Sequence, residues 1–269
     1  SNMKLLDIHA HLESSRFKNL NKIIEDAKKA GIRTIIQSGV NPTTNRESLK
    51  IKEKYPDIIK CSFGLYPLDV IAKDLENAQD DDMRHVEKFE IDDELKWIEQ
   101  HENDCVAVGE VGLDYQVINK DEKSIELQKK AFEKIIKFAK KINKPLIIHS
   151  RKAEADVIEI LEKHNFNNVI MHCFSGKKGL IKRGIENGYF FSVPPIIARL
   201  HHFENLVKLV PLTQLLTETD SPYLSPTAGE INEPANVTVT IKKISEIKDI
   251  SEEEVAKAIW ENASGLGLV

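Results

Sequence analysis

The chain has 269 residues, of which 41% are hydrophobic, and a formal net charge of −5 at pH 7. This length can bury one large core, and the negative charge argues against binding nucleic acid through a broad basic face. The three cysteines show no C-x-x-C spacing, so neither a disulfide framework nor a thiolate metal site is indicated. No apolar run reaches the length of a membrane span, and we expect a cytoplasmic protein without a membrane partner.

Short apolar runs alternate with longer helical patterns along the chain and predict eight strands. They lie at 5–8, 34–37, 59–63, 106–108, 146–148, 169–171, 189–192 and 215–217. One helical stripe ends at Gly31, a typical residue after a helix, another stops before Pro145, and Ser251 can cap the last helix.

Eight strand and helix units in this length match an α/β fold of the (β/α)8 TIM barrel type. A doubly wound open sheet or two smaller domains would be the alternatives, but no linker separates two halves. We therefore expect one domain over residues 3–269. Ser1 and Asn2, which precede Met3, resemble an expression-tag remnant.

Two histidines, His9 and His11, follow the first predicted strand at alternate positions. Side chains at i and i+2 of a strand point to the same face, so both imidazoles can converge on one metal ion. Two close histidines also occur in surface loops. The pair therefore indicates a metal site only if further ligands are found elsewhere in the chain.

Such partners follow the other apolar runs: Glu110, His149, His172, Glu218 and Asp220. The carboxyl ends of barrel strands surround one pocket, where four imidazoles and the carboxylates of Glu110 and Asp220 would meet. Six ligands suit two divalent ions that share a carboxylate and a water. Imidazoles with carboxylates favour Zn²⁺, Mn²⁺, Fe²⁺ or Ni²⁺ over Mg²⁺. Taken singly, each histidine could be an ordinary residue of the barrel mouth, and each carboxylate a helix cap.

Other polar residues follow the same strands. Arg151 can pair with phosphate oxygens, although a salt bridge with Glu154 or Asp156 would also explain it. The turn that contains Ser175 could bind an anion through its backbone N–H groups.

Five motifs, taken together and in this order, resemble the TatD family of metal-dependent deoxyribonucleases. They are D-I-H-A-H-L at 7–12, G-E-V-G-L-D-Y at 109–115, H-S-R at 149–151, H-C-F-S-G at 172–176 and T-D-S-P-Y-L at 219–224. The resemblance covers essentially the whole chain. The segment 188–195 looks like the branch of the family that includes the third human TatD-domain protein.

The resemblance implies an amidohydrolase-like barrel with two divalent ions, Mg²⁺, Mn²⁺ or Zn²⁺. The implied ligands are His9, His11 and Asp220 for the first ion, His149 and His172 for the second, and Glu110 between the two. The implied activity is hydrolysis of DNA phosphodiesters, in many members as a 3′–5′ exonuclease. The expected partner is then a 3′ end or a single strand of DNA. The oligomeric state is left open, and a monomer is compatible with the sequence.

Two positions depart from the family pattern. Tyr66 replaces the usual histidine of a G-x-H-P motif, and Ile231 stands where arginine is common. Tyr66 can still donate a hydrogen bond, whereas Ile231 cannot. We therefore assign substrate binding to Tyr66, Arg151 and Ser175.

For catalysis, we assign Glu110 as the bridging carboxylate and Asp220 as the acceptor of a proton from the attacking water. The same apparatus could serve an amidohydrolase-type enzyme that cleaves a C–N, ester or lactone bond, including the deacylation of aminoacyl-tRNA. A third alternative is a metal-dependent barrel without turnover, acting as a scaffold or nucleic-acid binding module.

Overall fold

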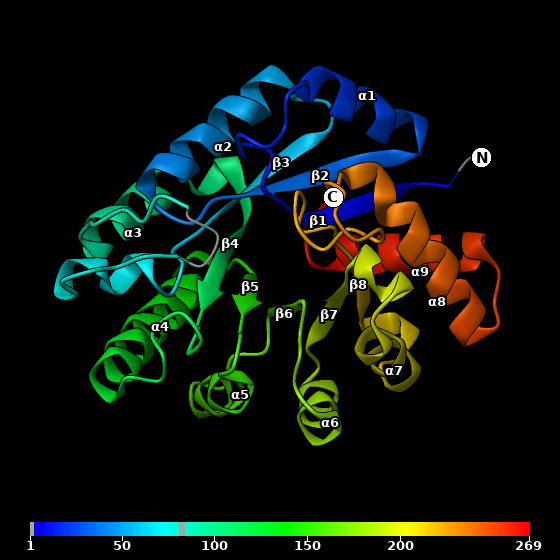
Figure 1. The fold of residues 1–269 in the computed structure, drawn as a ribbon. Helices are drawn as coiled ribbons and strands as arrows, with labels where there is room; N and C mark the ends of the chain where they lie inside the picture. Colours follow the sequence, from blue (N-terminus) through cyan, green and yellow to red (C-terminus); the bar gives the residue numbers. More distant parts are fainter. Residues whose placement is uncertain (1–2, 81–83) are drawn as a thin grey trace.

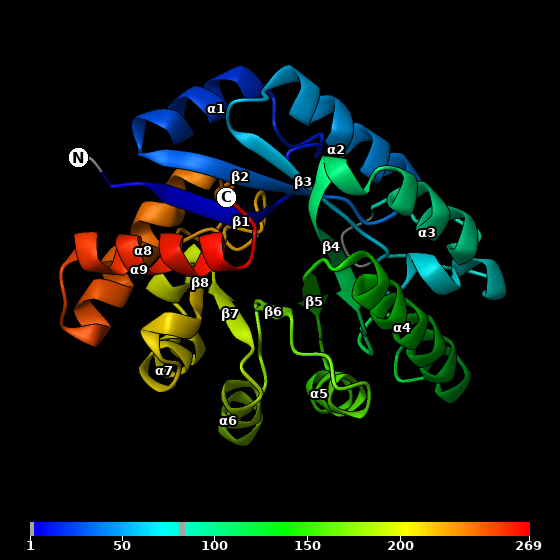
Figure 2. The same cartoon turned by 180° about the vertical axis from the view of Figure 1, so that it is seen from behind.

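The computed structural model describes residues 3–80 and 84–269 and forms the expected TIM barrel. Its strands follow one another in chain order around the sheet, and each is parallel to the next. The helices surround the strands in both views (Figures 1 and 2). Ser1 and Asn2, interpreted as a tag remnant, lie outside the described residues.

The strands are β1 (Leu5–Ala10), β2 (Ile32–Ser38), β3 (Ile59–Phe63), β4 (Cys105–Gly112), β5 (Leu146–His149), β6 (Val169–His172), β7 (Phe190–Val193) and β8 (Leu215–Thr217). The helices are α1 (Leu20–Lys29), α2 (Pro42–Lys54), α3 (Ile91–Gln100), α4 (Glu122–Ile142), α5 (Glu154–Lys163), α6 (Lys178–Glu186), α7 (His201–Leu209), α8 (Val237–Lys248) and α9 (Glu252–Gly265). Within the described ranges, none of these helices combines the length and apolar character that a bilayer crossing requires.

All eight predicted strands are present, but the sequence placed several strand ends too early. His9, Glu110, His149 and His172 lie within β1, β4, β5 and β6 instead of beyond them. Strands covered on both faces are apolar in most positions, so these polar residues looked like the start of loops. They are nevertheless strand residues whose side chains contact one another at the carboxyl end of the barrel.

The predicted helix ends are confirmed where local chemistry sets them. Gly31 follows α1 with a φ of +98°, a value that favours glycine. The Ser251 side chain accepts a hydrogen bond from Glu254 N at 3.1 Å and so caps α9. This helix is additional to the eight strand and helix units, and it packs against β1 and β8.

The barrel closes between β1 and β8 through bonds at the carboxyl ends of these strands. Asp220 N donates to His9 O, and His11 N donates to Ser221 O, both at 2.8 Å. The Thr217 hydroxyl donates to Leu6 O at 2.6 Å. These bonds fix the segment after β8 directly beside the two histidines of the first strand.

Asp7 strengthens this junction from inside the barrel. It is fully buried, and its Oδ1 accepts hydrogen bonds from Thr219 N at 2.9 Å and His9 N at 3.1 Å. The Thr219 hydroxyl donates to the other carboxylate oxygen. Burial raises the pKa of Asp7 to about 7, although these hydrogen bonds oppose the rise.

Close approach of β4 and β5 depends on Gly112. Its φ is +137°, and a Cβ at this position would lie 2.0 Å from His149 O. Gly229 also has a positive φ of +82°, but a Cβ there would meet nothing within 4 Å. Both glycines therefore have a backbone conformation that strains other residues, but only at Gly112 would an added side chain also clash with a neighbouring strand.

We expect Gly112→Ala to lower the free energy of unfolding by about 3 kcal/mol or more, because strain and a steric clash add. Gly229→Ala should cost only about 1 kcal/mol, since strain acts alone. Urea titration of both variants in EDTA, followed by circular dichroism, measures the difference. Equal losses would show that crowding against His149 does not matter.

Candidate metal centre

A cavity of about 670 Å³ opens at the carboxyl ends of the strands. It brings together predicted site residues from distant parts of the chain. The predicted residues that line it are His11, Tyr66, Glu110, His149, Arg151, His172, Ser175 and Asp220. His9 lies beneath them and is fully buried.

Two imidazoles and two carboxylates form the first half of the site. Asp220 Oδ1 lies 3.3 Å from His9 Nε2 and 3.2 Å from His11 Nε2. Glu110 Oε1 lies 3.4 Å and 3.5 Å from the same two nitrogens. Ligand atoms of His9, His11 and Asp220 lie within 4.8 Å of one another, as binding to a common ion requires.

The other oxygen of Glu110 faces the second half of the site. Glu110 Oε2 lies 2.7 Å from His149 Nδ1 and 3.5 Å from His172 Nε2. His172 Nε2 is also 3.9 Å from Asp220 Oδ2. The two oxygens of Glu110 thus face different pairs of histidines, which is the arrangement of a bridging carboxylate.

The buried ring of His9 tests whether a metal ion fits this site. Neither ring nitrogen meets hydrogen-bond geometry with a described residue, although Asp220 Oδ1 and Glu110 Oε1 lie 3.3 Å and 3.4 Å from Nε2. A buried polar atom without a hydrogen bond costs about 1–3 kcal/mol, and a cation bound by Nε2 and these carboxylates would offset this cost. Imidazole nitrogens and carboxylate oxygens are also the ligands that zinc and manganese use. The residues present therefore fit divalent ions.

Outer partners orient two of the other imidazoles. Glu218, fully buried, accepts a hydrogen bond from His172 Nδ1, and its second oxygen accepts from Ser192 Oγ at 2.7 Å and from Cys173 N at 2.8 Å. His11 Nδ1 lies 3.2 Å from Ser38 O. Such contacts fix the ring so that the remaining nitrogen points at an ion. The sequence placed Glu218 at a strand end but gave it no role.

Asp114 is the residue that sequence reasoning missed. Its Oδ2 accepts hydrogen bonds from His149 Nε2 at 2.7 Å and from Arg151 Nε at 3.0 Å. Burial by itself would raise the pKa of Asp114, but His149 and Arg151 more than offset this and the pKa is lowered. The carboxylate lies within the G-E-V-G-L-D-Y motif, which is the signal that could have singled it out.

The proposed substrate-binding residues differ in their surroundings. Tyr66 is buried, and its hydroxyl donates to Asp114 Oδ2 at 3.4 Å. Arg151 is partly exposed, and its Nε lies 3.0 Å from Asp114 Oδ2, a carboxylate that neither sequence interpretation named. Ser175 is exposed at the rim.

Neighbouring charges set the protonation of the cluster. Burial by itself would lower the pKa of His9, but the charge of Glu110 and the proximity of Asp220 raise it to about 9. Hydrogen bonds to Asp114 and Glu110 similarly overcome burial and raise the pKa of His149 to about 10. His9 and His149 therefore carry protons at neutral pH when no ion is bound.

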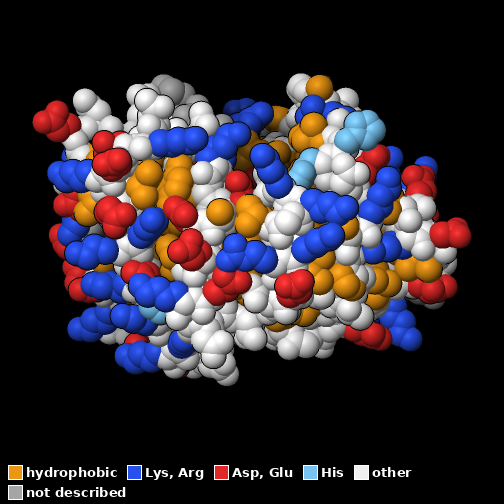
Figure 3. Space-filling model, turned by 90° about the horizontal axis from the view of Figure 1, so that it is seen from below, with side chains coloured by type: hydrophobic (Ala, Val, Ile, Leu, Met, Phe, Trp, Pro, Cys, Tyr) orange, Lys and Arg blue, Asp and Glu red, His pale blue; other side chains and the backbone are white. Residues whose placement is uncertain are grey.

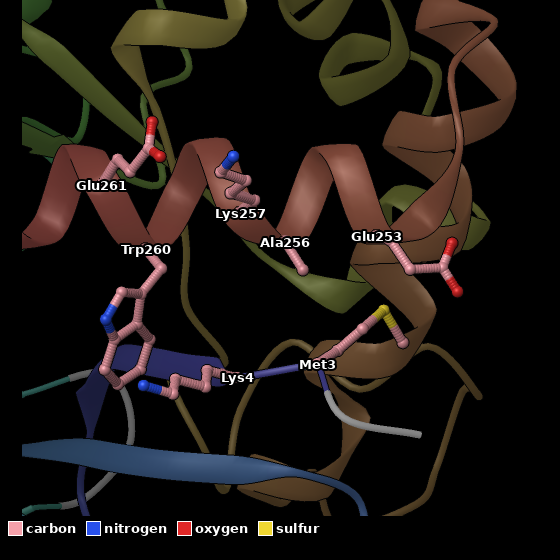
Figure 4. Close-up of a pocket in the computed structure, with 7 residues that line it drawn as sticks. All are labelled: Met3, Lys4, Glu253, Ala256, Lys257, Trp260 and Glu261. Carbon is pink, nitrogen blue, oxygen red and sulfur yellow. The ribbon is translucent and has the colours of Figure 1, made fainter.

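A second hollow, of about 430 Å³, lies between the residues before β1 and helix α9. The Lys4 side chain runs beside the Trp260 ring there, with Nζ 5.8 Å from the ring centroid (Figure 4). Its described lining residues include no histidine, and it adjoins the end of β1 remote from His9. The candidate ligands His11, Glu110, His149, His172 and Asp220 line the first cavity instead.

The chain resembles known proteins of one family along almost its whole length. A family profile described as TatD related DNase matches residues 6–266. The human protein named deoxyribonuclease TATDN3 is 32% identical over 262 residues, covering 96% of this chain and 93% of that protein. YabD of Bacillus subtilis, named an uncharacterized metal-dependent hydrolase, is 33% identical over 97% of this chain and 98% of its own length. The crystal structure of YJJV, a TatD homologue from Escherichia coli, matches all of both chains with a TM-score of 0.84 and 24% identity, which confirms the fold.

We expect divalent ions to release protons when they bind at pH 7, because a coordinating imidazole must be neutral and the pKa values of His9 and His149 lie near 9 and 10. Apparent affinity should therefore rise with pH between 6 and 8. Calorimetric titration with Mn²⁺ in two buffers of different ionisation enthalpy counts the protons.

His201 offers a control, because its side chain is 93% exposed and lies on α7. The variant His201→Gln should release as many protons as the unchanged protein. A pH-independent affinity without proton release would contradict the protonated state of the cluster.

Proposed function

The chain belongs to the family of TatD-related DNases and is a hydrolase, and from this premise we propose that it hydrolyses DNA phosphodiesters with two divalent ions. The observation that carries the proposal is the position of Glu110, whose two oxygens face two different pairs of histidines. The ligands would be His9, His11 and Asp220 for one ion, His149 and His172 for the other, and Glu110 for both. Mg²⁺, Mn²⁺ and Zn²⁺ are the candidate ions.

Bound ions would supply Lewis acidity, which activates water and neutralises charge on phosphate oxygens. Asp220 would accept the proton of the attacking water. Burial by itself would raise the pKa of Asp220, but the charge of His172 and the neighbouring His11 and His9 keep it below its usual range. Its carboxylate is ionised at neutral pH and can accept a proton.

Arg151 would bind a non-bridging phosphate oxygen. Asp114 accepts a hydrogen bond from its Nε, which orients the guanidinium at the cavity wall, and the side chain is 40% exposed. A guanidinium held in this way can pair with phosphate in a fixed orientation. Tyr66 and Ser175 line the same cavity.

The dimensions of the site favour a strand end as substrate. The cavity of about 670 Å³ falls within the range of about 300–1,000 Å³ typical of sites for small ligands. Figure 3 shows a side of the barrel, where basic and acidic side chains are interspersed. The size of the cavity supports recognition of a terminal nucleotide, and we propose cleavage as a 3′–5′ exonuclease.

We expect Asp220→Asn to lower kcat/KM on single-stranded DNA by about a thousandfold, because the proton acceptor and a metal ligand are lost together. Asp249→Asn is the matched control, since both aspartates have left-handed backbones, with φ values of 56° and 53°. Asparagine tolerates this conformation, so both variants should fold. The assay uses end-labelled single-stranded DNA with Mg²⁺, Mn²⁺ or Zn²⁺.

Product ladders in the same assay determine the polarity of cleavage. Loss of label from the 3′ end, one nucleotide at a time, supports the proposed exonuclease. Near-normal hydrolysis by the Asp220→Asn variant would reject the role of Asp220. If the unchanged protein hydrolyses esters or lactones but DNA with none of the three ions, the phosphodiesterase proposal is wrong.

A further inference from the structure

Arg16, Tyr223 and His11 lie in a row on one wall of the cavity. The Arg16 guanidinium carbon lies 5.7 Å from the centroid of the Tyr223 ring. That ring meets the His11 ring edge-on, with 6.2 Å between the centroids and an angle of 64°. All three residues line the cavity, so the row joins a candidate metal ligand to an exposed cation.

The surroundings of Arg16 differ from those of the other arginines of the cavity. Arg84 binds the buried Asp69 through both terminal nitrogens, at 2.6 Å and 3.1 Å. Arg151 donates to Asp114. In the part of the chain that the structure describes, no carboxylate lies within 4 Å of the Arg16 guanidinium. The guanidinium lies over the Tyr223 ring, and its N–H groups face solvent, where a ligand can reach them.

The topology places Arg16 and Arg151 on opposite sides of the metal centre. Arg16 follows β1, Arg151 follows β5, and these strands lie half a turn apart in a closed ring of eight. A polynucleotide bound with its reactive phosphate at the centre near Arg151 would have to extend across the ring towards the β1 side. Arg16 would then meet a neighbouring phosphate.

We propose that Arg16, supported by Tyr223, forms a second subsite that binds the phosphate next to the scissile one. This inference rests on the proposed phosphodiesterase function. When a guanidinium lies over an aromatic ring, the N–H groups at its edge stay available to donate to phosphate oxygens. The ring also restricts the orientations of the side chain, so less conformational entropy is lost on binding. The subsite favours substrates with at least two phosphodiester groups over those with one.

The test compares a substrate that has a neighbouring phosphate with one that lacks it. Single-stranded oligothymidylate supplies such a phosphate, whereas bis(4-nitrophenyl) phosphate has a single diester. Arg16→Gln should lower kcat/KM on the oligonucleotide about tenfold, mainly through KM, and leave hydrolysis of the small diester unchanged. The slope of log affinity against log salt should fall by about 0.7, the value for one lost contact to a single strand.

Arg33→Gln provides the matched control, because Arg33 is exposed near the amino end of β2, away from the cavity. It should behave like the unchanged protein with both substrates. If Arg16→Gln lowered kcat/KM equally on both substrates, the subsite would be overturned. The same holds if Arg16→Gln and Arg33→Gln lowered kcat/KM on the oligonucleotide equally.

Binding without turnover separates this inference from the proposed function. Fluorescence anisotropy measures the binding of labelled oligothymidylate to the metal-free protein in EDTA. Weaker binding by Arg16→Gln than by Arg33→Gln supports the subsite, even if the unchanged protein hydrolyses no diester. The absence of hydrolysis would reject only the proposed function. Equal binding by the two variants would overturn the subsite whatever the activity.

Discussion

The junction between β1 and β8 is the constraint on which the candidate site depends. Asp7 and Thr219, which are 212 positions apart in the chain, meet there in a buried hydrogen-bonded pair. The backbone bond from Asp220 N to His9 O lies beside this pair. Because these contacts fix the segment after β8, the Asp220 carboxylate lies against the histidines of β1 without further adjustment.

Carboxylates organise the cluster at two levels. Glu110 and Asp220 contact the imidazole nitrogens that would bind ions, whereas Asp114 and Glu218 contact the opposite nitrogens of His149 and His172. Protons on His9 and His149 balance part of this negative charge when no ion is bound. Ions of charge +2 can replace those protons with little movement of the side chains, since the rings of His11, His149 and His172 are already held from behind. This arrangement favours a site that forms on folding and then binds metal.

Much of the fold and of the inner site could be predicted because both depend on short-range patterns. Apolar runs revealed all eight strands, and a polar residue at the end of a run marked His149 and His172. The outer partners could not be found in this way, since the contact from Asp114 to His149 depends on the register of β4 against β5 and on side-chain rotamers. For the same reason, the contact between Asp114 and Arg151 could not be predicted.

If Glu110 bridges two ions, anomalous diffraction will show both of them in contact with its carboxylate. Crystals grown with Mn²⁺ and measured on both sides of the manganese absorption edge reveal each ion separately. We predict two peaks, one among His9, His11 and Asp220 and the other between His149 and His172, each in contact with one oxygen of Glu110. A single peak at saturating Mn²⁺, or peaks away from Glu110, would contradict the binuclear centre.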